Sequence, residues 1–269
     1  MKLLVTGGAG YLGSEVARLA VEQGWDVIAT RLEHAPPHGL PVRVDLRNED
    51  ETVRCLLMHR PEVVIHTAYR QNDDEVWDSI AKASRNIALA ATHAGSRLVH
   101  LSTDLVFGGE KEGRYTEDDE PKPVSLYGQA KLAAERGISE ISRGSLIVRT
   151  SLLFGKPGPQ EALVLRPDVE FYTDEIRTPV HVVELAAALL ELAEMELAGT
   201  LHVAGRDAVS RYEFARVLAA SQGRDPDRIR GRPSPPGARA HNVALDSSRA
   251  YALLRTPIHG VPTRAGRRP

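Results

Sequence analysis

The sequence predicts an α/β protein built on a doubly wound parallel sheet. Short apolar runs alternate with longer stretches of helical periodicity through the first 150 residues, a pattern typical of stacked strand-helix-strand units. A glycine-rich turn follows the first of these runs, and polar residues follow several of the others. Because such sheets bind ligands outside the carboxyl ends of their strands, these residues are expected to form a site at one edge of the sheet.

The elements of the sheet are expected in a regular order. The first strand is the apolar run at Leu3–Val5, which glycines interrupt too early for a signal peptide. A helix over 11–23 leads from it to a second strand at 26–29. The pattern then predicts strands at 42–44, 62–66, 97–101 and 145–148, separated by helices near 49–59, 73–94 and 127–141. The expected sum is six parallel strands.

The segment after residue 150 predicts a smaller mixed region. Prolines at 157, 159, 167 and 179 punctuate it, and a proline-rich stretch over 223–239 is expected to be a surface connection. The remaining elements are a helix near 181–196, a strand at 200–203, a helix near 210–222 and a short helix near 246–254.

Composition narrows the class of protein. The 269 residues carry 34 basic and 36 acidic side chains, so no global field favours nucleic acid or an anionic membrane as a partner. The single cysteine, Cys55, excludes an intrachain disulfide and fits a reducing compartment, with the cytoplasm as the expected location. The most apolar long stretch, 182–198, contains four glutamates, so no membrane span is expected there.

The glycine-rich turn carries the first functional prediction. Gly7, Gly10 and Gly13 follow a strand and open a helix, which is the context in which this motif binds a dinucleotide; the alternative is a turn with a structural role only. Gly7 permits the tight turn, Gly10 lets the backbone approach a pyrophosphate, and Gly13 allows the helix to pack closely on the sheet. The expected division is a Rossmann-type NAD(P)-binding domain over 1–150 and a mainly substrate-binding region over 151–269, with elements near 176–203 returning to the Rossmann core.

The end of the second strand bears on the choice of cofactor. An acidic residue there is typical of NAD sites, because a carboxylate accepts the ribose hydroxyls and repels a 2′-phosphate. This chain has Thr30 and Arg31 instead, which favours NADPH over NADH; the alternative is that Arg31 is simply exposed. Asp45 and Leu46, after the third strand, are expected to flank the adenine, unless Asp45 caps a helix that begins near Arg47.

Tyr127 and Lys131 indicate proton-transfer chemistry. Four residues apart on a helix, they share a face, so the ammonium of Lys131 favours the ionised form of the Tyr127 phenol. A phenol with a lowered pKa is a better proton-transfer group at neutral pH. The fifth strand ends in Ser102-Thr103-Asp104, which places hydroxyls where a substrate carbonyl would bind. The alternative for Ser102-Thr103-Asp104 is a capped turn. The alternatives for Tyr127 and Lys131 are an aromatic residue at the start of a helix and a solvated charge.

Four longer segments extend these motifs over nearly the whole chain. They are Ser102-Thr103-Asp104-Leu105-Val106-Phe107-Gly108-Gly109, Val148-Arg149-Thr150-Ser151-Leu152-Leu153-Phe154-Gly155, Arg177-Thr178-Pro179 and Arg239-Ala240-His241-Asn242-Val243-Ala244-Leu245-Asp246. With the Thr-Tyr-Lys set they resemble the dTDP-4-dehydrorhamnose reductases, a family of the extended short-chain dehydrogenases/reductases. The resemblance places at cofactor-contacting positions Gly10, Tyr11, Leu12, Thr30, Arg31, Asp45, Leu46, Ala68, Tyr69 and Arg70.

The resemblance implies reduction of a 4-keto sugar nucleotide by hydride from a nicotinamide. Tyr127 would protonate the developing alkoxide, and Thr103 would polarise the carbonyl. Lys131 would hold the nicotinamide ribose and lower the pKa of the tyrosine. Thr103, Asp104 and Leu152 fall where the family approaches its sugar.

Two departures from the family pattern concern the sugar. An aromatic residue usually stands where this chain has Leu105, and a tryptophan usually stands at Leu152. The segment after Phe154 also reaches Arg177 without the long helical stretch that typically encloses the nucleotide. Less surface is therefore available for stacking and burial, so the comparison favours reductase chemistry over specificity for a dTDP sugar.

Other functions remain as alternatives. A dehydratase would have an Asp-Glu pair after the threonine, whereas Asp104 is followed by Leu105, and an epimerase usually has an acidic residue where Thr30 stands. A non-catalytic NAD(P)-binding regulatory subunit is the alternative from another class, and the intact Thr103 and Tyr127 weigh against it.

The histidines and the apolar faces of two helices can each be interpreted as structural or as functional. The ten histidines are scattered without a compact ligand motif, so no metal is predicted. His66 ends a strand, where it is expected to lie in the core or at the sheet edge rather than beneath a nicotinamide. The apolar faces of the helices near 73–94 and 127–141 either form a homodimer interface or belong to the core.

Overall fold

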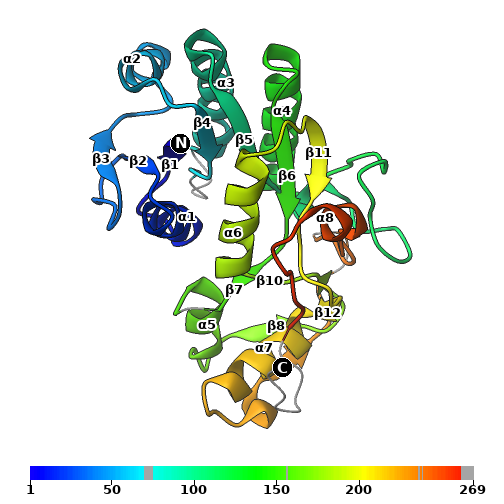
Figure 1. Ribbon diagram of the computed structural model, residues 1–269. Helices are drawn as coiled ribbons and strands as arrows, with labels where there is room; N and C mark the ends of the chain where they lie inside the picture. The colour runs from blue at the N-terminus through cyan, green and yellow to red at the C-terminus, as the bar shows by residue number, and fades with distance from the viewer. Residues whose placement is uncertain (70–74, 156, 236, 238, 262–269) are drawn as a thin grey trace. The chain divides into compact units, whose positions relative to one another are not determined.

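A seven-stranded sheet forms the centre of the first of two units into which the chain divides (Figure 1). The structure is a computed structural model, and it describes residues 1–69, 75–155, 157–235, 237 and 239–261. The first unit comprises residues 1–103, 126–149 and 186–201. The second comprises residues 104–125, 150–185 and 202–269, within the limits of the described ranges. The predicted Rossmann-type α/β fold is confirmed.

The strand order in the sheet is β11-β6-β5-β4-β1-β2-β3, and the register recorded for β1 through β5 is parallel throughout. The seven strands are β1 (Lys2–Thr6), β2 (Asp26–Arg31), β3 (Leu40–Arg43), β4 (Val63–His66), β5 (Arg97–Thr103), β6 (Leu146–Thr150) and β11 (Gly199–His202). The count of six was one short, because β11 comes from a part of the chain remote from the other strands. It adds the outer strand next to β6.

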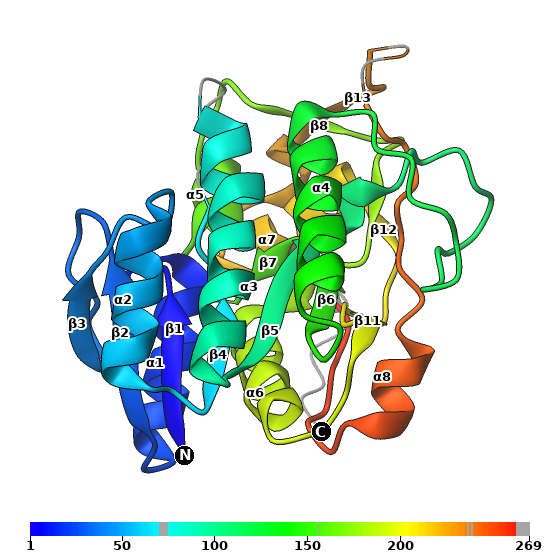
Figure 2. The same cartoon turned by 90° about the horizontal axis from the view of Figure 1, so that it is seen from above.

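The helices of this unit lie on both faces of the sheet. Figures 1 and 2 show α2, α3 and α4 together on one face, with α1 and the part of α6 from Ala186 onward on the other. The helices are α1 (Tyr11–Glu22), α2 (Glu49–His59), α3 (Ala83–Ala94), α4 (Leu126–Ile141) and α6 (Val182–Ala193). A π-helical turn, η2 (Asp78–Lys82), leads directly into α3.

The central strands are apolar along their length because helices cover both of their faces. In β1, Leu3, Leu4 and Val5 are fully buried. Leu4 belongs to a core cluster with Leu56 of α2 and Ile87 of α3, so α2 and α3 pack on the same face. The edge strand β3 is mostly exposed and contains a proline at position 41, where no neighbouring strand requires its missing N–H.

Helix α2 begins at Glu49, in agreement with the helix expected near 49–59. Its N-cap is Asn48, whose side chain accepts a hydrogen bond from Glu51 N at 3.1 Å. The alternative that Asp45 caps this helix is therefore wrong. The carboxylate of Asp45 instead accepts from Arg47, at 2.9 Å from Nε to Oδ1 and 2.8 Å from Nη2 to Oδ2.

The second unit contains short elements around its own core. Three two-stranded sheets pair β7 (Leu153–Phe154) with β10 (Val180–His181), β9 (Ile176–Arg177) with β12 (Val209–Ser210), and β8 (Glu170–Tyr172) with β13 (Arg230–Arg232). Four helical segments accompany them: η3 (Asp104–Val106), α5 (Pro159–Val164), η4 (Pro226–Arg228) and α8 (Ser248–Leu253). The largest helix is α7 (Arg211–Ser221), which carries Phe214 into a cluster with Phe154 and Phe171.

Helix α7 starts at a capping box. Ser210 Oγ accepts from Glu213 N at 3.0 Å, and the Glu213 carboxylate accepts from Ser210 N at 2.9 Å. This pairing fixes where the helix begins and therefore fixes the position of its first residue, Arg211. Among the described helices of the whole chain, none is both long and apolar enough to cross a membrane.

Candidate active site

The glycine-rich turn between β1 and α1 is tightly packed. Gly7 has φ +67°, in the left-handed region that favours glycine, and Gly10 N donates to Gly7 O at 2.8 Å. A Cβ at Gly13 would lie 2.3 Å from Gly7 O and 2.9 Å from Thr67 Oγ1, so only glycine fits there. Helix α1 is thereby drawn against the ends of β1 and β4.

The start of α1 suits a phosphate group. Its N-cap residue, Gly10, has no side chain that accepts from the first turn. The first N–H groups of a helix have no partner within the helix, and they carry the positive end of its dipole. A pyrophosphate is the type of group that satisfies such a turn. The residues present therefore fit a dinucleotide at this position.

The end of β2 lies beside the turn. Gly8 N donates to Thr30 O at 3.0 Å, and Thr30 is buried. Arg31 is partly exposed, and its Nη1 donates to the carbonyl of Glu33 at 3.1 Å. This guanidinium is therefore anchored near the turn, where a ribose 2′-phosphate would require a cation.

The segment after β4 contributes two of the predicted cofactor positions. Ala68 N donates to Thr6 Oγ1 at 3.1 Å, which ties this segment to the end of β1. Tyr69 is 45% exposed, and its ring centroid lies 5.8 Å from that of Tyr127. Arg70 lies outside the described residues. Leu46, after β3, uses its carbonyl to accept from Asn86 Nδ2 at 2.9 Å.

Lys131 is the most constrained of the predicted catalytic residues. It lies on α4, it is only 3% exposed, and its Nζ donates to Leu101 O at 3.0 Å. That bond places the ammonium against β5, two residues before Thr103. Burial lowers the pKa of Lys131 from 10.5 to about 8, and the nearby Glu135 carboxylate opposes the shift.

The ring of Tyr69 lies against the lysine. Its Nζ lies 5.1 Å from the ring centroid of Tyr69, and Tyr69 in turn contacts Tyr127, one helical turn before Lys131. Tyr127 also packs against a small cluster that includes Val76 and Ala130. Within this unit the structure thus brings the predicted tyrosine and lysine to one end of β5, where Thr103 is the last, buried residue.

Ser102 does not share this role. Its Oγ donates to Glu135 Oε1 at 2.5 Å, and Arg149 Nη2 donates to Glu135 Oε2 at 2.7 Å, all three residues being buried. Adjacent residues in a strand point to opposite faces, so Ser102 and Thr103 diverge. Glu135 and Arg149 support the site from behind, a role that sequence reasoning missed.

His66 is a core residue, in agreement with the expectation that it lies in the core or at the sheet edge. It is 1% exposed, and its two ring nitrogens lie 2.7 Å from Thr6 Oγ1 and 3.0 Å from Ser84 Oγ. Burial, aided by the charge of Lys131, lowers the pKa of His66 to about 3, so the ring stays neutral. The His100 ring is tilted by 36° relative to it, with the ring centroids 5.1 Å apart, and within the described residues neither ring nitrogen of His100 has a hydrogen-bond partner.

The predicted substrate residues Asp104 and Leu152 belong to the second unit. The Asp104 carboxylate is buried, accepts from Ser151 Oγ at 2.6 Å and lies 3.9 Å from Arg177 Nε. Leu152 packs against the cluster that contains Phe154. Asp104 follows Thr103 directly in the chain.

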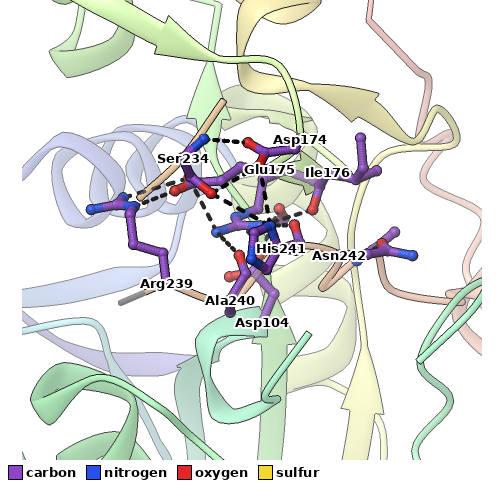
Figure 3. Close-up of polar contacts among 12 residues, drawn as sticks. Asp104, Asp174, Glu175, Ile176, Ser234, Arg239, Ala240, His241 and Asn242 are labelled. Atoms are coloured by element: carbon purple, nitrogen blue, oxygen red, sulfur yellow. Dashed lines mark hydrogen bonds and ion pairs between the residues drawn. The ribbon is translucent and has the colours of Figure 1, made fainter. Parts of the chain in front are cut away.

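A network of charged groups around Glu175 reaches Asp104 through Arg177. Figure 3 shows Glu175 with Arg239 directed toward it, and Asp174 with Ser234 and His241 beside them. His241 Nδ1 lies 3.3 Å from Asp174 Oδ2. Nothing in the sequence pattern around Glu175 had indicated this network, because its members come from separate segments.

In the ranges described, no group of three or more histidine, cysteine or acidic side chains is arranged to hold an ion.

The fold, the glycine turn and the Thr103, Tyr127 and Lys131 set define an oxidoreductase of the extended short-chain dehydrogenase/reductase class. The chain belongs to the RmlD substrate binding domain family, whose model matches residues 1–259. The resemblance to dTDP-4-dehydrorhamnose reductases that the motifs indicated is therefore confirmed.

Relatives of known name agree with this assignment. The chain is 31% identical to the probable low-salt glycan biosynthesis reductase Agl14 of Haloferax volcanii, over 94% of this chain and 92% of that protein. It is 30% identical to the dTDP-4-dehydrorhamnose reductase of Mycobacterium tuberculosis, over 96% and 88%. A solved structure described as a hypothetical dTDP-4-dehydrorhamnose reductase from Sulfolobus tokodaii has a TM-score of 0.85 at 31% identity, covering 97% of this chain and 98% of that one.

Two other comparisons bear on the alternatives. The methionine adenosyltransferase 2 subunit beta of Rattus norvegicus is 28% identical over 96% of this chain and 84% of that protein. A dTDP-4-dehydrorhamnose reductase from Bacillus anthracis, solved in complex with NADP, shares the fold with a TM-score of 0.83 at 24% identity, over 97% and 95% of the two chains.

Proposed function

We propose that this chain is an NADPH-dependent reductase of a 4-keto sugar nucleotide. The observation that carries the proposal is the buried Lys131, whose ammonium is held between the Leu101 carbonyl and the Tyr69 ring, one helical turn after Tyr127. A buried cation in this position has no evident structural use, since its burial opposes its own charge. The Lys131 ammonium would stabilise the anion that Tyr127 becomes when it releases its proton.

The residues have distinct tasks in the proposed reaction. When bound, the reduced nicotinamide supplies a hydride to the keto carbon of the sugar. Tyr127 gives its phenolic proton to the ketone oxygen, which becomes a hydroxyl, and the Lys131 ammonium stabilises the tyrosinate that remains. Thr103 donates a hydrogen bond to the same oxygen as negative charge develops on it.

Binding of the cofactor is assigned to the first unit. The turn at Gly7, Gly10 and Gly13 and the start of α1 would hold the pyrophosphate. Arg31 supports NADPH over NADH, because its guanidinium lies at the end of β2 where NAD sites carry a carboxylate. The NADP-bound structure of similar fold supports a nicotinamide cofactor.

A second candidate function rests on one observation, the likeness to methionine adenosyltransferase 2 subunit beta. In that case the chain would bind a nicotinamide cofactor and regulate another enzyme without turnover. The two candidates are separated by the absorbance of NADPH during incubation with a panel of 4-keto sugar nucleotides. Oxidation that depends on the sugar and disappears in Tyr127→Phe, with NADPH affinity retained, supports the reductase; binding without turnover over the panel supports the regulatory role.

A further inference from the structure

Glu175 organises a cluster of arginines in the second unit. Its carboxylate is fully buried and is ion-paired with Arg239 and with Arg177, whose Nη2 lies 3.5 Å from Oε2 (Figure 3). Arg177 is itself only 3% exposed and also donates to the carbonyls of Ile176 and Ala240, at 2.9 and 3.2 Å. The donors of these two guanidiniums are thus directed to the protein's own acceptors.

A third arginine joins the cluster without such a partner. Arg211 is the first residue of α7, and its backbone N donates to Glu175 O at 2.9 Å, which anchors it beside the carboxylate. Within the described residues, its guanidinium makes no hydrogen bond and no ion pair. Burial lowers the pKa of Arg211 below its ordinary value, and repulsion by Arg177 and Arg239 adds to the effect, while Glu175 and Asp104 oppose it.

The charge of Arg211 is in excess of the ion pairs that the cluster makes. Glu175 and Asp104 lie close enough to Arg211 to act on its charge, but within the described residues their ion pairs are with Arg177 and Arg239. An incompletely paired, partly desolvated guanidinium is unfavourable for the folded protein. Arg211 remains partly accessible, so a ligand can reach the excess charge.

The chemistry of the missing partner follows from the guanidinium itself. A guanidinium is planar, stays charged at any physiological pH and presents donors in a fork that matches two oxygens of one anion. The Asp104 in this cluster is the residue after Thr103, so the excess charge is associated with the segment that the substrate is proposed to contact.

We propose that Arg211 binds a phosphate-class oxyanion of the substrate, the diphosphate of a sugar nucleotide. The inference rests on the proposed function for the identity of the ligand, and on the arginine cluster for the site. Arg177 and Arg239 shape the site through Glu175 and keep the charge in excess. Arg211 supplies the free donors.

The test is direct binding without turnover. Isothermal titration calorimetry of the full chain with pyrophosphate and with UDP, each in the presence of saturating NADPH to occupy the glycine turn, is compared between wild type and Arg211→Gln. Loss of one charge-assisted contact is expected to raise Kd by about tenfold or more for both ligands. Equal affinity in the variant would overturn the proposal, as would the absence of binding to wild type.

Two controls isolate the role of Arg211. Arg216→Gln removes a charge from the same helix, but Arg216 is already paired with Asp227 at 2.6 Å, so its Kd for pyrophosphate is expected to match wild type. Arg211→Met keeps the aliphatic stem and removes repulsion from the neighbouring arginines, so it serves if the glutamine variant fails to fold. The same loss of affinity is expected from it.

Other ligands separate the sources of the oxyanion. Glucuronate presents a sugar carboxylate in place of a phosphate; if it bound more tightly than pyrophosphate and lost affinity in Arg211→Gln, the phosphate assignment would be overturned. Titration with NADPH distinguishes this proposal from the proposed function. NADPH binding and turnover that fail while pyrophosphate binding still depends on Arg211 would contradict the reductase and leave the anion site standing.

Discussion

Replacing Lys131 by methionine is expected to stabilise the apo protein while abolishing turnover. Burial lowers the pKa of Lys131 from 10.5 to about 8, and each pKa unit corresponds to roughly 1.4 kcal/mol, so the buried charge costs the folded state about 3 kcal/mol at neutral pH. Methionine has a similar length and no charge, but it loses the bond to Leu101 O, worth about 1 kcal/mol. The expected net gain at pH 7 is about 2 kcal/mol.

The pH dependence of this gain follows from proton binding. Below about pH 8 both the folded and the unfolded chain hold the Lys131 proton, so the penalty applies in full. Between about pH 8 and 10.5 the unfolded chain holds more protons at this residue than the folded chain does. Wild-type stability therefore rises with pH in this window, and the advantage of the variant shrinks.

Urea unfolding of wild type and variant across that pH window measures the difference. Lys122, whose side chain is 73% exposed, provides the control, because Lys122→Met is expected to show no pH-dependent gain. A Lys131→Met variant that is less stable than wild type at pH 7 would contradict the burial penalty assigned to the Lys131 charge. So would a stability difference that does not change with pH.

Three other variants test the local structure. Gly13→Ala would place a Cβ 2.3 Å from a carbonyl oxygen. It is expected to lose about 1–3 kcal/mol of stability by urea unfolding, together with NADPH affinity. The control Gly137→Ala, on α4, meets no atom within 4 Å and is expected to gain about 0.5–1 kcal/mol. Arg31→Asp is expected to shift the ratio of NADPH to NADH affinity toward NADH by about tenfold or more, as measured by fluorescence titration. Arg43→Asp, at an exposed position, is the charge-matched control. An unchanged ratio in Arg31→Asp would remove Arg31 from the cofactor site. Asn48→Ala is expected to cost about 1 kcal/mol of unfolding free energy through loss of the α2 cap, and no loss would show that the cap is redundant.

The elements predicted well are those whose signals are local. The turn at Gly7 and the spacing of Tyr127 and Lys131 lie within single supersecondary units, so strand, turn and helix signals coincide along the sequence. The cap of α2 was harder, because Asp45 and Asn48 are both suitable residues. Only the hydrogen bond from Glu51 N decides between them.

What the sequence did not predict depends on contacts between distant segments. A strand was expected at 200–203, but its place as the seventh strand of the sheet, beside β6, was not, because β11 follows a long passage of the chain through the second unit. The cluster around Glu175 likewise assembles residues 177, 211 and 239, and the charge of each looks solvated when it is taken alone. Hydrophobic period and turn chemistry carry no information on such pairings.

In the proposed reaction, this chain moves a hydride to a ketone, with Tyr127 as the proton donor. The most direct measurement is transfer of deuterium from NADPH labelled at C4 of the nicotinamide to a 4-keto sugar nucleotide, followed by mass spectrometry of the sugar. We expect a singly deuterated alcohol from wild type and none from Tyr127→Phe that still binds NADPH. Equal transfer by the variant would contradict the role of Tyr127, and no transfer by wild type to any 4-keto sugar nucleotide would contradict the reductase itself.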